Sequence, residues 1–244
     1  MRQLILILIF FQMFSITMKA SDGVILLHGL CRSASSMDRI AKALDNSGFI
    51  VVNQGYLSRN GTIEALSELA IHEALNDPRL SGCSKINFVT HSLGGILVRS
   101  YFKRHRDERL SRVVMLGPPN CGSEVVERIG HWWLFKVLNG PAGSELGTDR
   151  DSTPNQLGSV DFELGVIAGD RSINWINSLM IDGSDDGKVS VERTRVEGMK
   201  EQVIVHLTHP FLMKRKQVID LTIGFLKNGN FGMESTERIV DGDI

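Results

Sequence analysis

The sequence has few cysteines and no charge imbalance, and each of these absences excludes a class of protein. Its three cysteines, Cys31, Cys83 and Cys121, are too few and too scattered for a disulfide framework or a zinc site, so no metal is expected. Buried free thiols are the simpler expectation, although one disulfide could form in an exported chain. Lysine and arginine total 27 against 28 aspartates and glutamates, so no global field favours nucleic acid.

The N-terminus differs from the rest of this chain, whose 42% hydrophobic and 23% charged residues suit one globular domain. A basic start at Met1-Arg2 is followed by an apolar run from Leu4 to Met18. We predict that residues 1–20 form an export signal cleaved near Ala20. Because Met18 is large for the position three before the cut, an uncleaved membrane anchor is the alternative. The domain is then 21–228, exported to the periplasm or medium or retained at a membrane, and the polar, glycine-rich segment 229–244 is a flexible tail.

Short runs rich in valine and isoleucine alternate with amphipathic stretches along the domain. The runs predict strands at 24–28, 49–53, 86–90, 112–116, 163–168 and 202–207. The stretches predict helices at 35–47, 62–75, 93–105 and 210–227. This order is typical of an α/β fold, a mostly parallel central sheet with helices on both faces.

A long connection without clear periodicity, 123–160, separates two of the predicted strands. It contains Trp132-Trp133 and is otherwise rich in Gly, Pro, Asn and Ser. Long irregular connections are often functional, so we expect a small lid over an apolar cleft. A surface excursion with two buried tryptophans is the equal alternative.

The strongest motif is Thr90-His91-Ser92-Leu93-Gly94-Gly95, between a predicted strand and a predicted helix. This is the context of a nucleophile elbow, in which a serine sits on a sharp, strained turn. Gly94 supplies the small residue that the turn needs after the serine. Thr90 departs from the usual glycine before it, so the elbow must accommodate a β-branched side chain.

This motif, with His28-Gly29 after the first predicted strand, resembles the lipase and esterase branch of the α/β-hydrolases. The resemblance covers about 24–227 and implies an α/β-hydrolase fold with Ser92 as nucleophile. It also implies an acid and then a histidine later in the chain.

For the histidine, the candidates after Ser92 are His105, His131, His206 and His209. We choose His209, which follows the last predicted strand and precedes Pro210, a residue suited to the first helical position. His206 falls within the predicted strand and is more simply a packed residue.

For the acid, Ser184-Asp185-Asp186-Gly187-Lys188-Val189 resembles the Asp-Gly-x-Val segment that carries the carboxylate in bacterial lipases. That match favours Asp186. Asp185 beside it and Asp170, which follows the strand at 163–168, stay open as alternatives, and an Asp-Asp-Gly cluster can also be a plain turn.

The resemblance implies backbone N–H donors from Leu93 and Leu30 for the oxyanion, and no cofactor. We therefore expect a serine hydrolase acting on a small-molecule or lipid ester, with contact to a membrane surface and no nucleic-acid partner. A thioesterase or lipid acyltransferase would use the same acyl-enzyme, and a non-catalytic binding protein could share the fold. The oligomeric state does not follow from the sequence.

Overall fold

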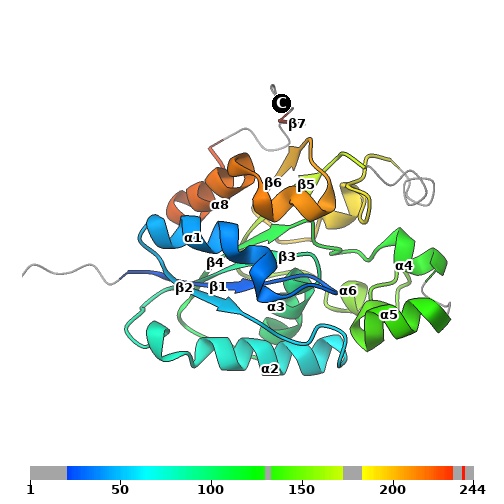
Figure 1. The fold of residues 1–244 in the computed structure, drawn as a ribbon, viewed down its shortest axis with the longest axis horizontal. Coiled ribbons are helices and arrows are strands. Elements are labelled where there is room, and N and C mark those ends of the chain that lie inside the picture. Colours follow the sequence, from blue (N-terminus) through cyan, green and yellow to red (C-terminus); the bar gives the residue numbers. More distant parts are fainter. Residues whose placement is uncertain (1–20, 130–132, 173–182, 233–237, 240–244) are drawn as a thin grey trace, which may run out of the picture.

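The structure is a computed structural model that describes residues 21–129, 133–172, 183–232 and 238–239 (Figure 1). Within this part, seven parallel strands form one sheet in the order β2-β1-β3-β4-β5-β6-β7. The strands are β1 (Gly23–Leu27), β2 (Ile50–Gln54), β3 (Ile86–His91), β4 (Leu110–Leu116), β5 (Glu163–Gly169), β6 (Glu201–Val205) and the short β7 (Arg238–Ile239). The predicted α/β class and its parallel sheet are confirmed.

Helices cover both faces of the sheet, as the sequence predicts (Figure 1). On one face lie α1 (Asp38–Asn46), preceded by η1 (Ala34–Met37), and α8 (Lys216–Asn228), preceded by η4 (His209–Lys214). On the other lie α2 (Ile63–Leu75) and α3 (Leu93–Arg104), with the short η2 (Pro78–Leu80) following α2. The helix predicted at 210–227 is thus two helices, because Arg215 between them has an extended backbone.

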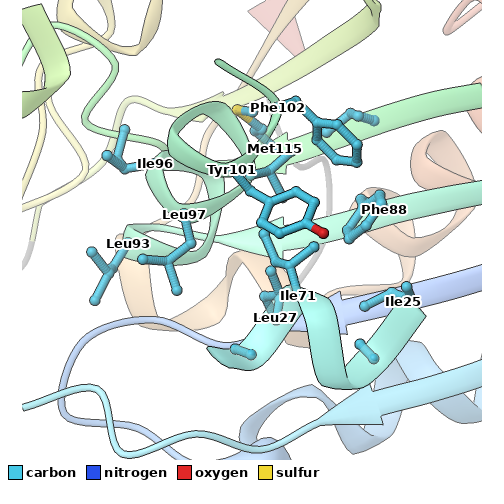
Figure 2. Packing of buried hydrophobic residues seen from close by; sticks show 14 of the residues in the cluster. Ile25, Leu27, Ile71, Phe88, Leu93, Ile96, Leu97, Tyr101, Phe102 and Met115 are labelled. Carbon is cyan, nitrogen blue, oxygen red and sulfur yellow. The ribbon is translucent and has the colours of Figure 1, made fainter. Parts of the chain in front are cut away.

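Successive side chains of the central strands point to opposite faces of the sheet and pack in two separate hydrophobic cores. Ile25 of β1 and Phe88 of β3 pack on the α2 and α3 side, whereas Val24 and Val89 pack on the α1 and α8 side. Figure 2 shows the first core, in which α3 packs its apolar side chains against β1, β3 and β4. Burial on both faces is what makes these strands read as continuous apolar runs.

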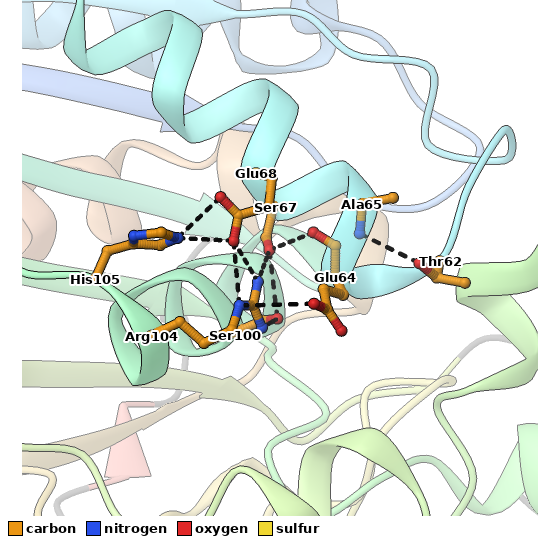
Figure 3. Close-up of polar contacts among 8 residues, drawn as sticks. All are labelled: Thr62, Glu64, Ala65, Ser67, Glu68, Ser100, Arg104 and His105. Atoms are coloured by element: carbon orange, nitrogen blue, oxygen red, sulfur yellow. Dashed lines mark hydrogen bonds and ion pairs between the residues drawn. The ribbon is translucent and has the colours of Figure 1, made fainter.

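Polar contacts join α2 to α3, from the buried Ser67 and Ser100 out to the exposed side chains of Glu68 and His105 (Figure 3). Glu68 of α2 accepts hydrogen bonds from Arg104 at 2.8 Å and lies 2.8 Å from His105 Nε2, and Ser67 bonds Ser100 at 3.3 Å. These partners, with His105 first, lower the pKa of Glu68. Because α3 begins directly after Ser92, the cluster helps to fix the helix that follows the candidate nucleophile.

The insertion at 123–160 contains helices that the sequence did not predict: α4 (Glu124–Ile129), α5 (Trp133–Ser144) and α6 (Thr153–Gln156). They lie beyond the carboxyl ends of the strands (Figure 1). The insertion is tied to the body near α2, where Glu145 accepts a hydrogen bond from the Ile63 amide at 2.9 Å. Trp132 lies outside the described residues, as do the segments 1–20 and 240–244.

The expectation that the cysteine side chains are buried holds only for Cys83. Cys31 is exposed and Cys121 is partly exposed. Among the helices that the structure describes, none is long and apolar enough to span a membrane.

Candidate active site

Ser92 sits at a strained turn between β3 and α3. Its backbone has φ 52° and ψ −119°, and a positive φ is uncommon for any residue with a side chain. The turn is held by the Ser92 amide, which donates to the carbonyl of Leu116 on β4 at 2.9 Å, and by the Ser92 carbonyl, which accepts from Gly95. The elbow geometry expected from the motif is therefore present.

Small residues make this turn possible. A Cβ on Gly94 would lie 2.6 Å from the carbonyl oxygen of Leu27, so α3 could not begin this close to β1 with any other residue. A Cβ on Gly95 would lie 3.2 Å from the Thr90 hydroxyl. The second glycine of the motif thus leaves the space that the β-branched Thr90 occupies, which explains how this elbow tolerates it.

Asp186 and His209 form a buried hydrogen-bonded pair. The Oδ2 atom of Asp186 lies 2.6 Å from Nδ1 of His209, and the His209 amide donates to the Asp186 carbonyl at 2.9 Å. The other carboxylate oxygen accepts from the backbone amides of Lys188 and Val189, each at 3.0 Å. With Nδ1–H donated to the carboxylate, the opposite ring nitrogen of His209 is left as an acceptor.

The rival acids and histidines lie in other arrangements. Asp170 is paired with Nδ1 of His206 at 2.9 Å, and Asp185 accepts from the Gly187 amide within the loop. The interpretation of His206 as a packed strand residue is wrong: β6 ends at Val205, and the His206 side chain is 41% exposed. His105 joins the surface cluster of Glu68, and His131 lies outside the described residues.

Ser92 and His209 line one cavity of about 230 Å³ at the carboxyl ends of the strands. Its walls come from the loop after β1, from the insertion and from the loop that carries Asp186. Its apolar lining consists of Leu30, Pro119, Val125, Val126, Leu146 and Val189. The insertion therefore supplies part of the wall through α4, and Asn139 of α5 also borders the cavity.

Leu30 lines this cavity, and Leu93 directly follows Ser92, which lines it too. Leu93 is the first residue of α3, where helix N–H groups lack an intrahelical acceptor, and Leu30 follows Gly29. A Cβ on Gly29 would lie 3.1 Å from Cβ of Ser92, so the Leu30 loop passes directly over the elbow. In the described part of the chain, neither amide has a hydrogen-bond acceptor.

Two buried histidines adjoin the site. Tyr56 stacks on His28 with ring centroids 4.1 Å apart and donates its hydroxyl to the His28 carbonyl, while burial lowers the pKa of His28. His91 lies 3.1 Å from the carbonyl of His209 through Nε2, and burial holds its pKa well below the usual range. The sequence carries no signal for the contact of His91 with the His209 backbone, because the two residues are 118 positions apart.

Within the described ranges, no three His, Cys, Asp or Glu side chains cluster in a way that could hold a metal ion. No family profile matches the sequence, and no curated protein matches it in sequence.

Solved structures do resemble the chain. The mature form of the Bacillus licheniformis lipase BlEst2 superposes with a TM-score of 0.65 at 18% identity, over 86% of this chain and 92% of that one. A thermophilic esterase from Thermogutta terrifontis gives 0.55 at 15% identity, over 85% and 90%. Phospholipase PlaB from Legionella pneumophila gives 0.57 at 20% identity, over 72% of this chain and 46% of that one. With the parallel sheet, these similarities show that the chain has the α/β-hydrolase fold.

Proposed function

We propose that this protein is a serine hydrolase that cleaves carboxylic esters through an acyl-enzyme on Ser92. The observation that carries the proposal is the buried Asp186–His209 hydrogen bond of 2.6 Å, at a cavity that His209 shares with the strained Ser92. A carboxylate paired with an imidazole, and a serine hydroxyl at the same cavity, are the parts that acyl transfer requires. The fold that the chain shares with lipases and esterases supports it.

In the proposed reaction, Nε2 of His209 accepts the Ser92 proton as Oγ bonds to the acyl carbon. The tetrahedral oxyanion accepts hydrogen bonds from the amides of Leu30 and Leu93, and Asp186 stabilises the imidazolium. The imidazolium then gives its proton to the leaving alkoxide as the carbon–oxygen bond breaks. Water then gives a proton to the same imidazole as its oxygen bonds to the acyl carbon. The bond from that carbon to Oγ breaks, the acid is released, and the imidazolium returns the proton to Ser92.

The test is turnover of 4-nitrophenyl esters with acyl chains of two to twelve carbons, for wild type and Ser92→Ala. We expect turnover that Ser92→Ala abolishes, and labelling of wild type but not of Ser92→Ala by a fluorophosphonate probe. Equal, slow rates in both proteins on all esters would refute catalysis and favour a binding protein with this fold. Thioesters and added alcohols, run in the same assay, distinguish a thioesterase or an acyltransferase.

We also propose that residues 1–20 direct export. Edman sequencing of the protein recovered from the producing cell is expected to start near Ser21. A protein that keeps Met1 and sediments with membranes would instead support the uncleaved anchor.

A further inference from the structure

The cavity that contains Ser92 is lined by two basic side chains, Arg32 and Lys188. They come from different loops: Arg32 follows Leu30 by two positions, and Lys188 follows Asp186 by two. Among the described residues, no Asp or Glu side chain lines the cavity. The charge at its walls is therefore positive, although the protein as a whole is close to neutral.

The side chains of Arg32 and Lys188 are exposed to solvent. In the described part of the chain, neither Arg32 nor Lys188 makes an ion pair or a side-chain hydrogen bond. Arg193, in the neighbouring loop, differs because it pairs with Glu124 at 2.8 Å. An anion entering the cavity could bind both cations without breaking an existing pair, and hydrogen bonds between charged groups are the strong ones.

The backbone holds both residues against the cavity wall. The Lys188 amide donates to Asp186 at 3.0 Å, and its carbonyl accepts from the Ser123 hydroxyl at 2.8 Å. The Arg32 amide donates to the Gly29 carbonyl at 3.3 Å. Both side chains thus originate beside the reacting groups, and only their flexible ends must be ordered when a ligand binds.

We infer that the substrate is an ester that also carries an anionic group, a phosphate or a carboxylate, which Arg32 and Lys188 bind. This inference rests on the proposed ester hydrolysis. The apolar wall formed by Val125, Val126 and Leu146 is suited to the acyl chain. At about 230 Å³ the cavity is smaller than the roughly 300–1,000 Å³ of common ligand pockets, which favours a short, single acyl chain.

The test compares esters in pairs that differ by one negative charge. 4-Nitrophenyl hemiglutarate against 4-nitrophenyl butyrate examines a carboxylate, and 1-butyrylglycerol 3-phosphate against monobutyrin examines a phosphate. The proteins are wild type, Arg32→Gln, Lys188→Gln and the double variant. Arg39→Gln and Lys42→Gln are matched controls, because both residues are exposed cations on α1 that do not line the cavity.

Wild type is expected to prefer the anionic member of at least one pair. The double variant should lower the anionic-to-neutral ratio of kcat/KM by about 10- to 100-fold, and the controls should not. The preference should also weaken between 0.02 and 0.5 M NaCl, because salt screens exposed charges. The ester pair whose kcat/KM ratio falls in the double variant shows whether the anion is a carboxylate or a phosphate. Anionic-to-neutral ratios near one in wild type, or equal ratios in wild type and all variants, overturn the inference.

Binding measured without turnover separates this inference from the proposed function. Isothermal titration of Ser92→Ala with butyl phosphate and with butyrate, against butanol, is expected to show binding of an anion that Arg32→Gln and Lys188→Gln together abolish. If no ester is cleaved but this binding is seen, the proposed hydrolysis fails and the anion site stands. If esters are cleaved with no anion preference and neither anion binds, the hydrolysis stands and the anion site fails.

Discussion

Nε2 of His91 lies 3.1 Å from the carbonyl oxygen of His209, and the two imidazole rings are 4.7 Å apart. Only a ring nitrogen that carries hydrogen can donate to a carbonyl, so the contact places the His91 proton on Nε2. Its Nδ1 is buried without a partner among the described residues. The residue before the candidate nucleophile therefore supports the backbone of the candidate base.

The buried neutral state of His91 predicts a pH-dependent stability. Burial, and next the neighbouring His209, hold the pKa of His91 well below 6.5 in the folded protein, and burial also lowers the pKa of His28. Below pH 6.5 the unfolded chain therefore binds more protons, so the unfolding free energy falls with decreasing pH. Each such histidine contributes up to about 1.4 kcal/mol per pH unit.

His91→Gln removes one of these groups and keeps an amide donor for the His209 carbonyl. Urea unfolding at pH 7.5, 6.5 and 5.5 should give a shallower loss of stability in acid than wild type shows. His72→Gln, a change of an exposed histidine on α2, controls for the altered histidine number. Parallel pH profiles for His91→Gln and wild type would contradict the prediction.

The three candidate acids predict a graded series of activity losses. Asp186→Asn should lower kcat by about 10³- to 10⁴-fold, because an amide cannot stabilise the imidazolium of His209 and favours the wrong tautomer. Asp170→Asn and Asp185→Asn should each cost less than about 10-fold, since Asp170 pairs with His206 and Asp185 accepts from the Gly187 amide. Steady-state rates on 4-nitrophenyl butyrate decide the order. A larger loss in Asp170→Asn than in Asp186→Asn would reassign the acid.

Local patterns were sufficient to predict the strands and the elbow, because each of these features is encoded by neighbouring residues. Val24 to Leu27 are buried on both sides and read as one apolar run, and Gly94 is required within two residues of Ser92. Features set by contacts between distant segments could not be predicted. His206 was misinterpreted because its partner, Asp170, meets it only through the pairing of β5 with β6.

Two other features were also missed, each for its own reason. The helices of the insertion were hidden by its glycine and proline content: α5 includes Pro141 and a kink at Gly140, whose φ is 71°. The two cations of the cavity could not be predicted from neighbouring residues. Arg32 and Lys188 line the same cavity only because the loops after β1 and β5 lie at the same ends of the strands.

Two helical glycines offer a matched test of the elbow. Gly94→Ala should lower the unfolding free energy by about 1–3 kcal/mol, because its Cβ would lie 2.6 Å from the Leu27 carbonyl in the central strand β1. Gly224→Ala in α8 meets no atom within 4 Å and should raise stability by about 0.5–1 kcal/mol. Urea denaturation measures both. Equal effects of the two substitutions would contradict the close approach of α3 to β1.

The buried Arg99 joins α3, the helix that follows Ser92, to the insertion at 123–160. Its guanidinium, on α3, donates to the carbonyls of Asn120 at 2.7 Å, Pro154 at 3.0 Å and Gly158 at 2.7 Å. Burial lowers the pKa of Arg99 to about 10, so the group is still charged at neutral pH. No carboxylate is bonded to it in the described residues, and the charge is solvated by these carbonyl oxygens and by Oδ1 of Asn120 at 3.2 Å.

Arg99→Met should therefore leave these carbonyls buried without donors, at a cost of about 3–5 kcal/mol of unfolding free energy. Because the carbonyls belong to the insertion and to the loop before it, limited proteolysis should cut within residues 145–160 faster than in wild type. Arg99→Lys should be intermediate, since an ammonium group cannot reach both sides as the planar guanidinium does. Lys103→Met, an exposed change on the same helix, is the control. Stability loss in Arg99→Met with an unchanged cleavage pattern would mean that Arg99 supports the core and does not hold the insertion.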